Sequence, residues 1–178
     1  YDYRVFEPWL PSAHGAQPRQ QVVIVDSGPA GMVAALELAR HGVASVRRTT
    51  EECSRLGIGQ LSLYCLSSEN WKRPRGELDF LMRLLEQYMI EERATILDQN
   101  IQACVIGRRD GIPDNALREM DRTVQLSAEN TGLRLCLAIN YGGRAELVDT
   151  VRRIAREVAE GHLGVSEIGE GVISDRLY

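Results

Sequence analysis

Residues 61–74 read LSLYCLSSENWKRP, and this stretch decides the fold class. Its first half, residues 61–66, is a short apolar run that predicts a buried strand. Its second half is polar and ends at Pro74, so we expect the strand to end in a loop. Apolar side chains then recur at the spacing of an amphipathic helix. They are Leu78, Leu81, Leu85, Tyr88 and Met89.

The same alternation of strand and helix extends in both directions from this stretch. Further strands are predicted at residues 22–25, 101–106 and 133–139. Helices are predicted from Gly28 to about residue 40, over 46–57, from Pro113 onward, and around residues 147–158. Because helices separate the strands, we expect right-handed crossovers and a single parallel sheet flanked by helices, an α/β fold. Residues 1–20 are expected to form an irregular leader, and residues 21–178 a single domain.

Four of the predicted helices carry apolar stripes that we expect to face the core. One stripe is that of residues 78–89 above. The other stripes are Val46, Cys53 and Leu56; Leu117, Met120 and Val124; and Leu147, Val151, Ile154 and Val158.

Composition excludes several classes of protein. The 178 residues carry a formal net charge of -4, which argues against a nucleic-acid-binding module, since such modules are normally basic. No apolar run reaches the ~18 to 20 residues of a membrane-spanning helix, and the N-terminus lacks the pattern of a signal peptide. The cysteines are scattered, so we expect a reduced, cytoplasmic chain with buried thiols. They are Cys53, Cys65, Cys104 and Cys136.

Residues 22–42, VVIVDSGPAGMVAALELARHG, predict a strand, a glycine turn and a helix that could receive an anion. The segment resembles the dinucleotide fingerprint of FAD-dependent monooxygenases, over about residues 1–46. That resemblance implies FAD contacts at Gly28 and Gly31. However, Asp26 replaces the first glycine of the fingerprint, and a carboxylate there would repel a pyrophosphate. A strand–turn–helix unit without ligand is the alternative.

From Ser45 to Tyr178 the chain resembles the cis-prenyltransferases, the isoprenyl transferases that include undecaprenyl diphosphate synthase. The motifs that carry the resemblance lie in the order and spacing of that family. They are SVRRT at 45–49, LGI at 56–58, LYCLSSENWKRP at 63–74, VIG at 105–107, NTGL at 130–133 and NYGGRAE at 140–146. The resemblance implies an enzyme that condenses isopentenyl diphosphate with an allylic prenyl diphosphate, using Mg²⁺, to make a polyprenyl diphosphate.

The resemblance also implies site residues in two places. The loop after residues 61–66 supplies substrate contacts, with Asn70 implied as catalytic, and the next helix lines the tunnel for the growing isoprenoid. The loop residues are Ser67, Ser68, Asn70, Trp71 and Arg73, and the tunnel residues are Leu81, Leu84 and Leu85. Two alternatives stay open. The Trp71 ring could pack the loop, and the leucines could be ordinary core.

Two departures from the family pattern bear on function. The family continues its first strand with D-G-N-G-R-W-A, where this chain has Asp26-Ser27-Gly28. Asp26 is therefore either the Mg²⁺-linked catalytic acid or a replaced fingerprint glycine. The family also continues beyond the position of Tyr178 into a basic substrate motif and its dimer-forming region.

These departures lead us to expect a hybrid that joins the two resemblances near Ala44. We also expect a sheet incomplete at the C-terminus and a chain of impaired activity that lacks the family's homodimer contacts. Contact with a membrane is expected only at its periphery, through the lipid product. An FAD- or NAD-binding oxidoreductase fragment and a non-catalytic α/β binding module are the rival functions.

Overall fold

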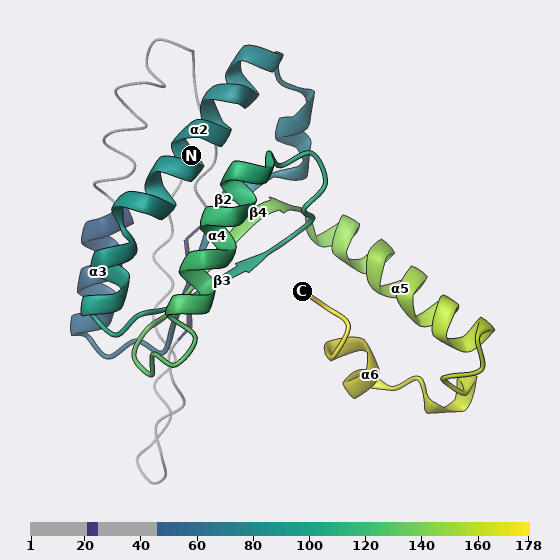
Figure 1. The fold of residues 1–178 in the computed structure, drawn as a ribbon. Coiled ribbons are helices and arrows are strands. Elements are labelled where there is room, and N and C mark those ends of the chain that lie inside the picture. Colours follow the sequence, from purple (N-terminus) through teal and green to yellow (C-terminus); the bar gives the residue numbers. More distant parts are fainter. Residues whose placement is uncertain (1–20, 25–45) are drawn as a thin grey trace, which may run out of the picture.

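The computed structural model describes residues 21–24 and 46–178 (Figure 1). The helix predicted after Gly28, and with it Asp26, Gly28 and Gly31, lies outside the described residues. The strands are β1 (Gln21–Ile24), β2 (Gln60–Ser67), β3 (Gln102–Ile106) and β4 (Arg134–Tyr141). The helices are an unlabelled one over residues 46–55, η1 (Ser68–Lys72), α2 (Arg75–Glu91), α3 (Arg93–Asp98), α4 (Asp114–Leu126), α5 (Gly143–Ala159), η2 (Val165–Glu167) and α6 (Glu170–Ser174).

The four described strands form one parallel sheet in the order β1-β2-β4-β3. This confirms the predicted fold class. β4 lies between two neighbours, and residues from Leu135 to Asn140 are all buried. A strand buried on both faces reads as a continuous apolar run, which is why residues 133–139 were recognisable without alternation.

Two helices cover one face of the sheet. Figure 1 shows α2 and α4 side by side over the sheet, and their methionines Met82, Met89 and Met120 are buried in the shared core. Polar contacts join the same layer, since Arg93 Nε donates to Thr123 Oγ1 at 2.9 Å and Thr123 Oγ1 donates to the Met89 carbonyl at 3.1 Å. Because Thr123 is fully buried, these bonds satisfy a hydroxyl that water cannot reach.

The stripe predicted on α5 does not join this core, so that prediction was wrong. Ile154 is buried, but Leu147 and Val151 are 56% and 63% exposed. Figure 1 shows α5 running away from the sheet, with α6 beside it. The stripe instead lines an open apolar groove of about 520 Å³ with side chains from η2, α6 and the link between them. A helical stripe predicts that one face is apolar, without specifying which surface it meets.

Two smaller expectations also fail. Leu56 is 61% exposed, since the helix over 46–55 has ended before it. Cys65 is exposed and Cys104 half-buried, so only Cys53 and Cys136 are the buried thiols we expected. All four cysteines are free thiols. Within the described ranges, no helix is both long and apolar enough to cross a membrane.

Candidate functional site

The candidate site lies at the carboxyl edge of the sheet. Because the strands are parallel, the chain leaves β2 at Ser67, β4 at Tyr141 and β3 at Ile106 along the same edge. Open α/β sheets bind ligands outside this edge, where the loops gather. β1 ends there too, at Ile24, and Asp26 follows it in the sequence, outside the described residues.

The loop after β2 brings Asn70 and Arg73 together. Asn70 Oδ1 accepts a hydrogen bond from Arg73 Nε at 3.2 Å, and the Asn70 carbonyl accepts one from the Arg73 amide at 3.0 Å. Arg73 Nη1 also donates to Glu77 Oε2 at 3.3 Å, from the first turn of α2. A guanidinium has five N–H donors. Within the described part of the chain these bonds use two of them, so three stay available for a phosphate, on a side chain that is only 23% exposed.

The two serines of the loop lie against the end of β4. Ser67 is the last residue of β2, is half-buried and pairs in register with Tyr141. A Cβ added to Gly142 would lie 2.6 Å from Ser68 Oγ, which shows how closely the Ser68 side chain approaches the turn after β4. The structure therefore brings the SSENW and NYGG motifs together at one edge.

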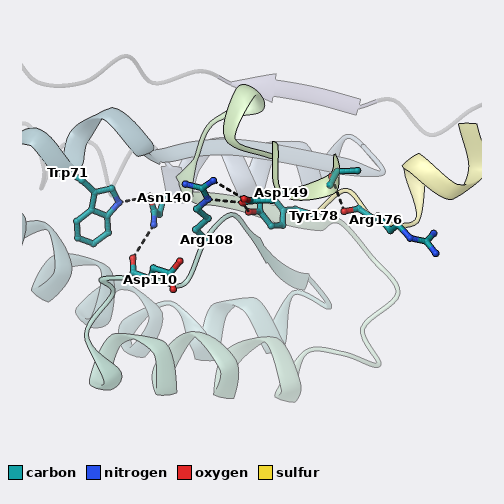
Figure 2. Close-up of polar contacts among 8 residues, drawn as sticks. Trp71, Arg108, Asp110, Asn140, Asp149, Arg176 and Tyr178 are labelled. Atoms are coloured by element: carbon teal, nitrogen blue, oxygen red, sulfur yellow. Dashed lines mark hydrogen bonds and ion pairs between the residues drawn. The ribbon is translucent and has the colours of Figure 1, made fainter. Parts of the chain in front are cut away.

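Trp71 ties the same loop to its neighbours (Figure 2). Its indole Nε1 donates a hydrogen bond to Asn140 Oδ1, and Asn140 Nδ2 donates to the Asp110 carbonyl at 3.1 Å. The ring also covers Gly111, where an added Cβ would lie 3.1 Å from it. These contacts support the loop-packing interpretation of Trp71. Substrate contact by Trp71 stays a prediction.

A second group of polar side chains lies beside this edge and was missed from sequence. Arg108, just after β3, forms a bidentate ion pair with Asp149 of α5. Its Nε donates to Oδ2 at 2.6 Å and its Nη2 to Oδ1 at 2.8 Å. The Tyr178 hydroxyl donates to Asp149 Oδ2 at 2.6 Å (Figure 2). Arg108 and the Tyr178 hydroxyl together lower the pKa of Asp149 to about 2. No local pattern reveals a pair 41 residues apart, although the arginine directly follows the VIG motif.

The leucines predicted to line a tunnel all lie on α2 and are half-buried. Leu81 and Leu85 pack against the core cluster beneath the helix. This contact is compatible with both the core and the tunnel interpretation, and a tunnel role stays a prediction for Leu81, Leu84 and Leu85.

A metal site is not formed by the described residues alone. Residues 21–24 and 46–178 contain no group of three or more His, Cys, Asp or Glu side chains placed to hold a metal ion. Mg²⁺ characteristically uses one or two carboxylates together with substrate phosphates. A single carboxylate at Asp26 would fit that mode, with the remaining ligands supplied by substrate and water.

Comparisons with known proteins agree with this arrangement. A sequence family described as "Putative undecaprenyl diphosphate synthase" matches residues 34–178. An isoprenyl transferase of Rhodopirellula baltica is 46% identical over 164 residues, covering 90% of this chain and 67% of that protein. An isoprenyl transferase of Bacillus subtilis is 40% identical over 137 residues, or 77% of this chain. The chain spans 53% of that relative's length.

Two solved structures have similar folds. Lavandulyl diphosphate synthase from Lavandula x intermedia, in complex with dimethylallyl diphosphate, superposes with a TM-score of 0.78 at 28% identity, covering 88% of this chain and 70% of that one. A probable undecaprenyl diphosphate synthase from Campylobacter jejuni gives 0.70 at 26% identity, covering 89% and 68%. The prenyltransferase resemblance is confirmed, and the family match begins at residue 34, ahead of the expected start at Ser45. The join near Ala44 stays a prediction.

Proposed function

The chain belongs to the undecaprenyl diphosphate synthase family of isoprenyl transferases, and we propose that it joins isopentenyl diphosphate to an allylic prenyl diphosphate. The product is a longer prenyl diphosphate. In this reaction the allylic carbon–oxygen bond breaks and inorganic diphosphate leaves. The double bond of isopentenyl diphosphate forms the new carbon–carbon bond, and a proton is lost.

The pairing of Asn70 with Arg73 at the end of β2 is the observation that carries the proposal. A leaving diphosphate gains negative charge as the bond breaks, and fixed donors in a half-buried corner stabilise that charge more than water does. Arg73 presents three N–H donors in a planar fork, which suits phosphate oxygens. Asn70 Oδ1 fixes the orientation of the Arg73 guanidinium by accepting the hydrogen bond from Arg73 Nε. Ser67 and Ser68 add hydroxyl donors from the same loop.

The position of α2 relative to Arg73 sets the direction in which the apolar chain of the substrate would extend. α2 starts two residues after Arg73 and rises about 1.5 Å per residue, so Leu81, Leu84 and Leu85 follow at increasing distance from Arg73. These three leucines share one helix face by their spacing. An isoprenoid whose diphosphate lies at Arg73 would therefore extend along α2, with its tail toward the leucines.

Mg²⁺ is proposed to take part through Asp26. When bound, it would neutralise charge on the diphosphate. Asp26 comes two residues after the end of β1 in the sequence, and β1 pairs directly with β2. The peripheral membrane contact through the lipid product and the cytoplasmic location rest on the family resemblance and remain proposals.

Binding is the first test of the proposal. Isothermal titration calorimetry with dimethylallyl diphosphate and Mg²⁺ should show saturable binding to the full chain. Arg73→Ala should weaken it by at least tenfold, since a charge-assisted bond to phosphate contributes about 1.5–3 kcal/mol. Arg75→Ala is the matched control, because Arg75 is exposed and lies two residues away. Equal losses in both variants would contradict a site at Arg73.

Turnover is the second test. Isotope-labelled isopentenyl diphosphate should enter an organic-extractable product, and Asp26→Asn should abolish this while the exposed control Asp79→Asn keeps it. Tight binding of the prenyl diphosphate without product would favour the non-catalytic binding module. A preparation that absorbs as bound flavin, with no affinity for the prenyl diphosphate, would favour the oxidoreductase.

A further inference from the structure

Cys104 and Cys136 form a side-by-side pair on the sheet, away from its carboxyl edge. The register of β3 and β4 pairs Cys104 directly with Cys136, and β2 places Ser62 opposite Cys136 on the other side. Residues paired in a parallel ladder project to the same face. Neighbouring strands lie roughly 4.8 Å apart, within the Cα separation of about 4.4–6.8 Å that a disulfide allows.

The two thiols have unequal environments. Cys136 is 5% exposed, whereas Cys104 is half-buried. The Cys136 thiol and the neighbouring Arg134 guanidinium lower the pKa of Cys104, although burial opposes them. The same contact with Cys104, together with burial, raises the pKa of Cys136. Reactive cysteines are found in such partly exposed surroundings beside a cation, whereas cysteines enclosed in apolar surroundings are inert.

We propose that Cys104 and Cys136 are a redox-active dithiol that closes into an intramolecular disulfide when a low-molecular-weight disulfide such as oxidised glutathione is the oxidant. This goes beyond the isoprenyl transfer proposed above and does not depend on it. Cys104 is the attacking residue because it is the more accessible of the pair, and Cys136 is the resolving residue because it lies opposite.

The chemistry is an ordinary pair of thiol–disulfide exchanges. The Cys104 thiolate attacks one sulfur of the small disulfide, forms a mixed disulfide and releases one small thiol. Cys136 then loses its proton, attacks the Cys104 sulfur and releases the second small thiol. The two protein thiols lose two electrons and two protons in total, and the small disulfide gains both.

The test uses the folded full chain in graded ratios of oxidised to reduced glutathione. We expect loss of two of the four thiols, an intact mass lower by two hydrogens, and a peptide that links Cys104 to Cys136 by mass spectrometry, all reversed by dithiothreitol. Cys136→Ser should instead hold one glutathione on Cys104. Cys104→Ser removes the attacking thiol, so thiol–disulfide exchange at this pair of residues should no longer occur.

The control is Cys65→Ser, since Cys65 is exposed but lies outside the pair. It should form the Cys104–Cys136 disulfide at the same ratio as the unaltered chain. Circular dichroism of each variant checks that the sheet is intact. A disulfide to Cys53 or Cys65, mixed disulfides without closure, or four unreacted thiols in a folded chain would overturn the proposal.

Discussion

Replacing Trp71 by phenylalanine tests how the loop after β2 is held. The change replaces the bicyclic indole by a single six-membered ring and removes the indole N–H, so Asn140 Oδ1 loses its donor. Asn140 is 5% exposed, and water cannot readily replace that donor. A buried acceptor left without a partner costs about 1–3 kcal/mol, and we expect the free energy of unfolding to fall by that amount.

The partner residue provides the control through a double-mutant cycle. Asn140 has a φ of 49°, so Asn140→Gly removes the side chain while keeping a backbone that glycine tolerates. Urea unfolding should show that Trp71→Phe costs less in the Asn140→Gly background, by a coupling of about 1 kcal/mol or more. Equal losses in both backgrounds would refute the bond as the reason for Trp71's position.

The same variant separates the two interpretations of Trp71. If the ring only packs the loop, Trp71→Phe should change affinity for dimethylallyl diphosphate by less than tenfold while lowering stability. If the ring binds substrate through its N–H, the affinity should fall with little change in stability. The hydrogen bond to Asn140 leads us to expect the first result.

Three further predictions concern the surroundings of the site. In a urea titration, Gly107→Ala should lower the free energy of unfolding by more than about 3 kcal/mol, because φ is +114° and the new Cβ would lie 2.0 Å from the Ile139 carbonyl oxygen. Gly76→Ala is the control and should be neutral or slightly stabilising, because open space surrounds that glycine. The pKa of Asp149 is lowered to about 2 from an unfolded value near 3.9, so its ion pair stabilises the fold above about pH 4 and is lost as pH falls toward 2. Asp149→Asn should therefore remove this part of the pH dependence of the free energy of unfolding. An unchanged acid profile would contradict the pairing. By thermal melting, Ile154→Ala should lower the free energy of unfolding by about 2–4 kcal/mol and Val151→Ala by less than about 1 kcal/mol, since only Ile154 is buried. Equal losses in the two variants would mean that both side chains lie on a covered face of α5.

The sheet was predictable because its strands are continuous apolar runs between polar breaks. Residues 133–139 needed no long-range information, since a strand buried on both faces carries its own signal. Residues 61–66 were recognisable instead from their alternation, in which Leu61 and Leu63 are buried while Ser62 and Tyr64 are half-buried. Their order in the sheet, with β4 between β2 and β3, needed the structure. The prediction that α5 packs against the core was wrong for a related reason. A stripe that includes Leu147 and Val151 indicates an apolar face but not the surface that this face contacts.

The candidate site was predictable in part. Asn70 and Arg73 are three residues apart in a loop after a strand, and their pairing follows from local geometry at the sheet edge. The bond from Trp71 to Asn140 spans 69 residues, and the ion pair of Arg108 with Asp149 spans 41. Such contacts arise from how strands and helices pack, which spacing along one sequence does not encode.

The most direct measurement is a crystal structure of the full chain with dimethylallyl diphosphate and Mg²⁺. The carboxyl-edge site predicts phosphate oxygens within hydrogen-bonding distance of the Arg73 guanidinium, with the prenyl carbons directed along α2 toward Leu81. A diphosphate bound on another surface, with Arg73 still bonded only to Asn70 and Glu77, would contradict it.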